Sequence, residues 1–200
     1  MRKLIVFNHV SLDGYFVDAN DSMSWAKTRK DDAEWNAFVA QNASGEGPLV
    51  FGRKTYELMI KYWPTPMAKQ HDAQVADRMN KLPKVVFSRT LKDVTWSNTT
   101  LVKGGLVEAV QRMKAETGDG ITILGSGTLV AQLADSDLID EYHIVINPVA
   151  LGNGRTMFEG IHEKENGNKL EVKPMKSRTF GNGCVYLVYE PEAKAASRAA

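Results

Sequence analysis

Short apolar runs alternate with helical stretches along most of this chain of 200 residues, and no other feature constrains its fold as strongly. The runs at 49–51, 99–102 and 121–124 each end in a glycine turn that leads into residues at helical spacing. Towards the C-terminus several strand-like runs follow in a row, and Gly181-Asn182-Gly183 joins the last two as a hairpin. The pattern predicts an α/β fold of three αβα layers, with a mainly parallel mixed sheet that ends in an antiparallel C-terminal hairpin.

No linker or repeat interrupts residues 1–190, so we expect a single domain there. Within it, residues 17–30 predict a long loop, and residues 68–82 predict one polar helix. Residues 191–200 are small, polar and rich in alanine, which predicts a flexible C-terminal tail.

Composition narrows the classes of partner. The formal net charge is +1, so there is no basic field to suggest nucleic acid. The single cysteine, Cys184, excludes an intramolecular disulfide and a cysteine-based metal cluster, and it fits a reducing cytoplasm. The four histidines show no metal-ligand spacing, so we expect no metal. No apolar run approaches the ~20 residues of a membrane span, so we expect no membrane partner.

Three strand ends carry residues that favour an anion. They are Gly52-Arg53-Lys54-Thr55, Ser88-Arg89-Thr90 and the turn Gly125-Ser126-Gly127. Glycine at a helix start lets a phosphate approach the free N–H groups, and the carboxyl ends of parallel strands gather ligands at one edge of a sheet. Each segment alone also fits an ordinary turn. Together they predict one ligand with several phosphates, such as a dinucleotide with a 2′-phosphate.

Asp32 is the candidate catalytic carboxylate, and Glu34 follows it closely. An acid at this place, just before a helical pattern, caps the helix or complements its dipole. The alternative is that its side chain faces a cleft and assists a proton transfer. The sequence leaves both interpretations open. Asp13, which precedes Gly14, is interpreted as a turn residue.

Several motifs resemble one family. They are "SLDGYF", "LVFGRKTYE", "KVVFSRT", "ILGSGTLVAQLADSDLIDEYHIVINPVALGNGRTMF" and the closing hairpin, which together span residues 3–190. The chain resembles the dihydrofolate-reductase-like family. It is most similar to stand-alone relatives of the reductase domain, the C-terminal one, of bifunctional riboflavin-biosynthesis deaminase–reductases.

The resemblance implies NADPH as the cofactor. It implies that Arg53, Lys54 and Thr55 face the adenine-side phosphates and the pyrophosphate, and that Ser88 and Arg89 bind the 2′-phosphate. It also implies that Asp32 corresponds to the carboxylate that holds a pterin. The full cofactor set that it implies is Gly52, Arg53, Lys54, Thr55, Ser88, Arg89, Gly125, Ser126, Gly127, Thr128 and Leu129.

The expected function is therefore that of an oxidoreductase, an NADPH-dependent reductase that transfers hydride to a small, pterin- or pyrimidine-like substrate. The alternative is a non-catalytic nucleotide-binding or sensor protein on the same scaffold. Classical relatives hold the folate tail with an arginine that follows a Leu-Pro pair. Here Leu82-Pro83 leads almost directly into a strand, with only Lys84 as a cation, which argues against folate. We also expect a homodimer built partly from the C-terminal strands, because residues 142–151 are apolar on both faces.

Overall fold

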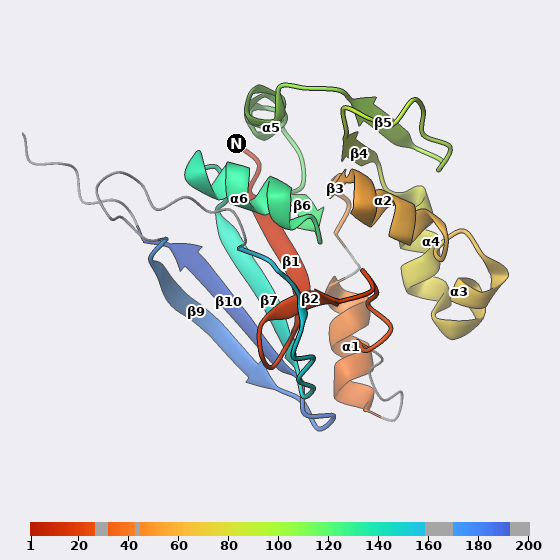
Figure 1. Cartoon of the computed structure of the whole chain (residues 1–200), viewed down its shortest axis with the longest axis vertical. Coiled ribbons are helices and arrows are strands. Elements are labelled where there is room, and N and C mark those ends of the chain that lie inside the picture. Colours follow the sequence, from red (N-terminus) through yellow and green to blue (C-terminus); the bar gives the residue numbers. More distant parts are fainter. Residues whose placement is uncertain (27–31, 43–44, 159–169, 193–200) are drawn as a thin grey trace, which may run out of the picture.

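A computed structural model describes residues 1–26, 32–42, 45–158 and 170–192, and its centre is one large sheet (Figure 1). Its eight strands are β1 (Leu4–Ser11), β3 (Leu49–Gly52), β4 (Lys84–Phe87), β5 (Thr99–Val102), β6 (Ile121–Leu124), β7 (Glu141–Asn147), β9 (Val172–Thr179) and β10 (Val185–Pro191). They lie in the order β5-β4-β3-β6-β1-β7-β10-β9. A second, two-stranded sheet pairs β2 (Tyr15–Asp18) with β8 (Gly154–Thr156).

The strand directions follow the predicted pattern. From β5 to β7 the neighbouring strands are parallel, whereas β10 runs antiparallel to β7 and β9 antiparallel to β10. Parallel strands buried on both faces need continuous apolar runs, and Leu49, Val50 and Phe51 of β3 are all buried. The fold class and the hairpin at residues 181–183 are confirmed.

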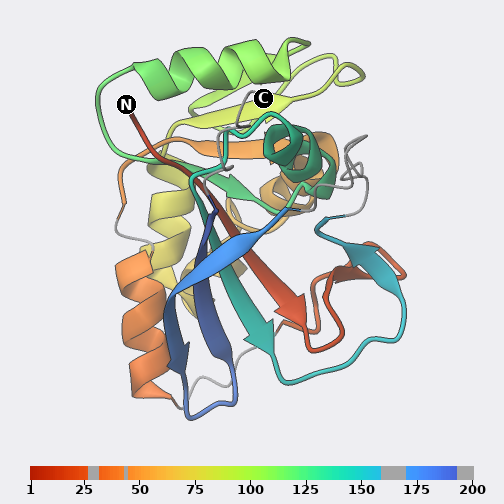
Figure 2. The ribbon, with the colours of Figure 1, turned by 90° about the vertical axis from the view of Figure 1, so that its left-hand side faces the viewer.

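Helices cover both faces of the sheet. They are α1 (Ala33–Asn42), α2 (Arg53–Ile60), α3 (Pro66–His71), α4 (Ala73–Lys81), α5 (Leu106–Ala115) and α6 (Gly127–Asp135). Apolar side chains of α5 and α6 pack on one face against β1, β3 and β6. On the other face α1 packs against β7 and β10, and α2 and α4 pack against β3 and β4. Figure 2 shows α1 beside the hairpin of β9 and β10.

Two local predictions were wrong. Residues 68–82 form two helices, because Asp72 has an extended backbone that ends α3, and its side chain accepts from Val75 N–H to cap α4. Residues 15–18 form a strand at the start of the predicted loop, because β8 pairs with them across the chain. Residues 27–30 of that loop lie outside the described residues.

The first two residues of the predicted C-terminal tail, Pro191 and Glu192, pair with the strand β9 and the residue before it. β10 continues through Pro191, and Glu192 N–H donates to the carbonyl of Glu171 at 2.9 Å. Pairing with β9 therefore extends into the segment that its composition marked as flexible. Residues 193–200 lie outside the described residues.

Lys84 is a buried cation on β4 that caps a helix. It is 1% exposed, and its Nζ donates to the carbonyls of Met79, Asn80 and Leu82 at the end of α4. The ammonium also lies over the Trp96 ring, 4.7 Å from its centroid. Burial lowers the pKa of Lys84 to about 8. The Lys84 side chain is therefore part of the core.

Within the described part of the chain, no helix is both long and apolar enough to cross a membrane.

Candidate cofactor site

The carboxyl ends of β3 and β6 meet through direct contacts. Gly52 N–H donates to Ser126 Oγ at 2.7 Å, and Ser126 Oγ donates to Thr55 Oγ1 at 2.9 Å. A Cβ on Gly125 would lie 2.7 Å from Thr55 Oγ1, so only glycine fits there. The structure thus brings together four residues from two of the predicted segments.

The turn before α6 leaves the start of this helix without a side-chain cap. Gly125 and Ser126 both have a left-handed backbone, with φ of 60° and 62°. That conformation is uncommon for serine, and it directs the hydroxyl to Gly52 and Thr55 instead of α6. Among the described residues, no side chain hydrogen-bonds to the first N–H groups of the helix. The N–H groups of Gly127 and Thr128 and the helix dipole favour an anion at this helix start, whereas Leu129 N–H donates to the Ser126 carbonyl at 2.8 Å.

Asn8 holds this turn from β1. The side chain is 4% exposed, its Oδ1 accepts from Gly125 N–H at 2.6 Å, and its Nδ2 donates to the Gly125 carbonyl at 3.4 Å. Sequence analysis did not assign Asn8 to the site. The available signal was an amide at an inward position of an otherwise apolar strand.

The two cations that begin α2 both have carboxylate partners. Arg53 Nη1 lies 3.5 Å from Glu57 Oε1, one turn along the helix. Lys54 Nζ lies 2.8 Å from Asp21 Oδ2, on the loop after β2. Both cations are about half exposed, so they remain accessible to a ligand at the end of β3.

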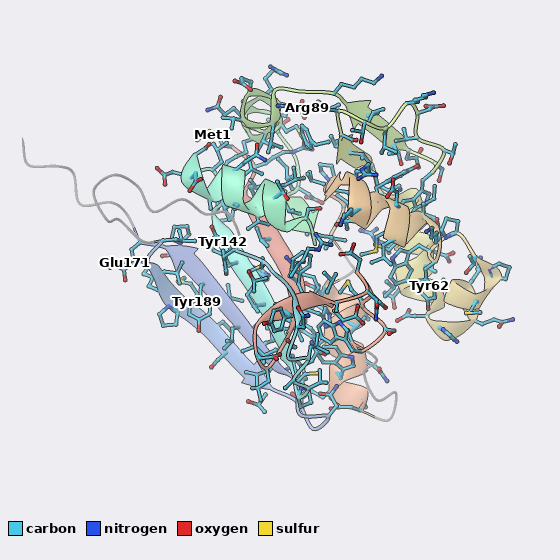
Figure 3. The ribbon with its side chains drawn as sticks, viewed as in Figure 1. Met1, Tyr62, Arg89, Tyr142, Glu171 and Tyr189 are labelled. Atoms are coloured by element: carbon cyan, nitrogen blue, oxygen red, sulfur yellow. The ribbon has the colours of Figure 1, made fainter. Side chains whose placement is uncertain are left out.

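Ser88 and Arg89 lie two strands away from the α6 turn. Ser88 N–H donates to the Val102 carbonyl at 3.0 Å, so the ends of β4 and β5 lie side by side. Ser88 Oγ accepts from the N–H groups of Thr90 and Leu91, which fixes the turn. Arg89 is exposed, and in Figure 3 it lies between α5 and β5.

Lys103 adds a cation that sequence analysis missed. It follows Val102 directly and is exposed beside Ser88. Gly105 then begins α5 with a left-handed backbone and no side-chain cap among the described residues. The signal was a lysine and two glycines after a strand, a cation and glycine together as at Gly52 and Arg53. The four strand ends from β5 to β6 form a row roughly 14 Å long, at ~4.8 Å per strand. That length suits a ligand with several phosphates.

Asp32 caps α1 and ties it to the hairpin. Its Oδ1 accepts from Trp35 N–H and its Oδ2 from Asn182 N–H, both at 2.9 Å. These backbone hydrogen bonds, first that of Trp35, hold the pKa of Asp32 below its ordinary value. Glu34 accepts two hydrogen bonds from Arg178 of β9. Asp32 is therefore an ionised acceptor, and a catalytic role for it stays a prediction.

A neutral polar cluster lies beside α1. His9 Nδ1 accepts from Asn147 Nδ2 at 3.4 Å, and Cys184 Sγ donates to Asn147 Oδ1 at 3.6 Å. The His9 ring contacts the Trp35 indole edge-on, with centroids 6.0 Å apart. Burial lowers the pKa of His9 to about 4 and raises that of Cys184. Both groups are uncharged near neutral pH. Among the described residues, no group of histidine, cysteine and carboxylate side chains could hold a metal ion.

The chain is similar to a known family of reductase domains. The family model of the RibD C-terminal domain matches residues 2–186. The uncharacterized protein YyaP of Bacillus subtilis (strain 168) is 26% identical over 188 residues, which cover 94% of each chain. These matches confirm the resemblance to reductase domains of this type.

Solved structures confirm the fold. A putative riboflavin biosynthesis protein from Shewanella sp. PV-4 superposes with a TM-score of 0.72 at 25% identity, over 96% of this chain and 99% of that one. A dihydrofolate reductase from Enterococcus faecalis, complexed with NADP(H) and RAB-propyl, superposes with a TM-score of 0.59. It is 13% identical over 96% of this chain and 97% of that chain. At this identity the similarity supports the fold only.

Proposed function

The chain belongs to the family of RibD C-terminal domains, and from that premise we propose that it is an NADPH-dependent reductase. The family and its structural neighbours support an oxidoreductase of the reductase type. We further propose that its cofactor is NADPH and that its substrate is a small heterocycle, pterin- or pyrimidine-like.

One observation carries the proposal: the joined turns of β3 and β6 leave the N-terminus of α6 uncapped next to cations. Gly125 lets the Thr55 hydroxyl lie where a Cβ would collide with it, which joins the two turns, and a phosphate is favoured at the free N–H groups that follow in α6. Gly52, Arg53, Lys54 and Thr55 would hold the adenine-side phosphates, and the turn from Gly125 to Leu129 would hold the pyrophosphate. Ser88, Arg89 and Lys103 would hold the 2′-phosphate.

The nicotinamide, when bound, supplies the hydride. The residues of this chain would bind and orient the cofactor and the substrate, and would exclude water. Asp32 would act as an acceptor for N–H groups of the substrate. Its oxygens already accept from the N–H groups of Trp35 and Asn182, and a substrate N–H would add to these contacts. A heterocycle with an amino group or ring N–H suits such an acceptor. His9 would offer a neutral imidazole nearby.

We also propose that the protein is a homodimer. Three cross-strand pairs join Ile146 to Val185, Ile144 to Leu187 and Tyr142 to Tyr189 on one face of β7 and β10. The opposite face of these strands is buried under α1, whereas five of these six side chains are only partly buried. A second copy would cover them, and Figure 3 shows Tyr142 and Tyr189 at this part of the sheet.

The test measures cofactor binding and turnover separately. Fluorescence titration should give at least a tenfold lower Kd for NADPH than for NADH, since a charge-assisted contact contributes roughly 1.5–3 kcal/mol. Arg89→Gln should reduce this preference, whereas Lys92→Gln, on the same loop, should leave it unchanged. NADPH oxidation is then followed over a panel of pterins and pyrimidines. Equal Kd values for both cofactors would refute NADPH. Binding without any oxidation would favour the non-catalytic nucleotide-binding alternative.

A further inference from the structure

One carboxylate bridges two cations that lie far apart in the sequence. Asp21 Oδ2 accepts from Lys54 Nζ at 2.8 Å, and Asp21 Oδ1 accepts from Arg155 Nε at 2.8 Å. Lys54 belongs to α2, Arg155 to β8, and Asp21 to the loop after β2. These contacts, first the hydrogen bond from Lys54, hold the pKa of Asp21 below its ordinary value. Each carboxylate oxygen thus holds one cation.

Lys54 stands beside the turn that begins α6. The next residue, Thr55, hydrogen-bonds to Ser126, and a Cβ on Gly125 would lie 2.7 Å from Thr55 Oγ1. Lys54 is therefore one residue away from direct contact with this turn. Its side chain is 53% exposed, so Asp21 does not bury it.

Arg155 is next in sequence to a residue that packs against α6. A Cβ on Gly127 would lie 3.2 Å from the carbonyl oxygen of Thr156, so β8 packs directly against the first turn of α6. The guanidinium lies over the Phe16 ring, 5.3 Å from its centroid, which fixes its position. Two cations from separate elements therefore meet at Asp21, and each is next in sequence to a residue that packs against the start of α6.

We infer that Lys54 and Arg155 form a binding site for a phosphate-bearing ligand beside α6, and that the Asp21 carboxylate occupies this site in the free chain. A carboxylate and a phosphate offer the same chemistry to a lysine and an arginine, namely anionic oxygens at hydrogen-bond distance. The inference extends the proposed function, because it adds Arg155 to the cofactor site and gives that site an internal competitor.

Asp18 shapes the loop independently of the two cations. Its Oδ1 accepts from the N–H groups of Asn20 and Ser22, both at 2.9 Å. Asp21 has a left-handed backbone, with φ of 56°, which aspartate and asparagine tolerate better than most residues. The turn therefore keeps its own hydrogen bonds when the Asp21 side chain leaves Lys54 and Arg155.

The Asp21 carboxylate and an anionic ligand would compete for the same two cations. An anionic ligand that enters beside Asp21 meets a like charge, and one that displaces Asp21 takes over both cations. Ligand binding and release of the Asp21 loop are thus coupled. A ligand without a phosphate would gain no contact with the two cations by displacing Asp21. Asp21 would therefore stay bound to Lys54 and Arg155.

The test compares Asp21→Asn with wild type, using inorganic pyrophosphate and NADPH as separate probes in calorimetry. Asparagine keeps the left-handed backbone but loses the charge. Because exposed ion pairs are weak individually, we expect both probes to bind about three- to tenfold more tightly. Asp18→Asn removes one charge from the same loop without touching Lys54, so it should bind both probes like wild type. The double variant with Arg155→Gln should lose the gain.

A second measurement follows the loop itself. Trp25 Nε1 donates to the Ser22 carbonyl at 3.1 Å, so its indole N–H signal in NMR reports on this loop. Pyrophosphate should shift that signal in the wild type, and Asp21→Asn should shift it in the same direction without any ligand. Trp25→Phe assigns the signal.

The outcomes separate the two proposals. Tighter pyrophosphate binding by Asp21→Asn without any NADPH binding would support the inference and refute the proposed function. NADPH oxidation with equal Kd values in wild type, Asp21→Asn and Asp18→Asn would support the function and overturn the inference. An equal gain in Asp18→Asn, or no pyrophosphate binding by any variant, would also overturn it.

Discussion

Asn8 and His9 are neighbours on β1 whose side chains serve opposite faces of the sheet. Asn8 pairs with the backbone of Gly125 and so fixes the turn before α6. His9 faces α1, where it contacts Trp35 and Asn147. Alternation along a strand makes this division possible, since successive side chains point to opposite faces. A single strand thus supports the predicted cofactor turn and the region around Asp32.

His9 predicts a pH dependence of stability. Burial lowers its pKa to about 4, from an ordinary value near 6.5, so the unfolded chain binds more protons than the folded chain between these pH values. The free energy of unfolding should therefore fall as the pH drops from 6.5 to 4. The loss should be about 3 kcal/mol at the lower end. Urea unfolding at a series of pH values measures it.

Two variants isolate this contribution. His9→Gln removes the partly buried imidazole and should flatten the dependence between pH 6.5 and 4.5. His71→Gln removes an exposed histidine and should not. Carboxylates with lowered pKa values, such as Glu141 and Asp13, add their own loss only at lower pH. A wild-type curve that stays flat from pH 6.5 to 4.5 would contradict the assignment.

Local patterns predicted the residues that sit where a strand becomes a helix. Gly52, Thr55, Gly125 and Ser126 follow apolar runs directly, and the structure joins them by hydrogen bonds. Arg155 could not be found this way. It lies in a segment without strand or helix pattern, and only the pairing of β8 with β2 brings it near α6.

Among the secondary-structure elements, α1 depends on the hairpin that closes the chain. Asp32 and Glu34, at the start of α1, bind Asn182 and Arg178 of the hairpin. The sequence separation between these partners is large, so neither tie was visible from local pattern. The same holds for β2 and β8. The sequence of each segment is typical of a turn or loop, and only their pairing in the fold makes them strands.

Asp32 variants separate its structural role from its proposed role towards the substrate. Asp32→Ala loses the cap and the hairpin tie, so we expect the melting temperature to fall by roughly 3–6 °C and turnover to fall as well. Asp32→Asn keeps an oxygen for the cap but loses the charge. It should lower turnover about tenfold or more with a smaller change in melting temperature.

Glu34→Gln is the matched control for the hairpin tie. It weakens the contact with Arg178 but leaves Asp32 in place, so turnover should not change. Calorimetry and steady-state rates on the same preparations give both quantities. Normal turnover in Asp32→Asn would limit this residue to capping α1.

In the whole molecule, the predicted cofactor residues and the proposed dimer face lie on different strands of one sheet. The predicted cofactor residues lie at the carboxyl ends of β3, β4 and β6, whereas the apolar pairs lie on β7 and β10. Strand-by-strand pattern was sufficient for the fold class, because alternating strands and helices allow few arrangements. It could not decide between an exposed sheet edge and an exposed sheet face as the contact, since that depends on the strand order.

The strand order favours the face. β9 forms the edge beyond β10, and it carries Pro174, Lys173 and Lys176, all exposed. Proline and lysine on an edge strand oppose pairing with another chain. The face beside it presents partly buried apolar side chains, and Phe158, which contacts Tyr142, is 42% exposed.

Light scattering at micromolar concentration should therefore give a mass of twice the 22.2 kDa of one chain. Leu187→Lys places a charge on the partly buried face and should shift the mass towards one chain, because a second copy would bury that charge without a partner. Met67→Lys, at a side chain of α3 that is 58% exposed, adds the same charge elsewhere and should leave the dimer intact. A wild-type mass near one chain at every dilution would refute the dimer, and the cross-strand pairs of β7 and β10 would then serve the fold of a single chain only.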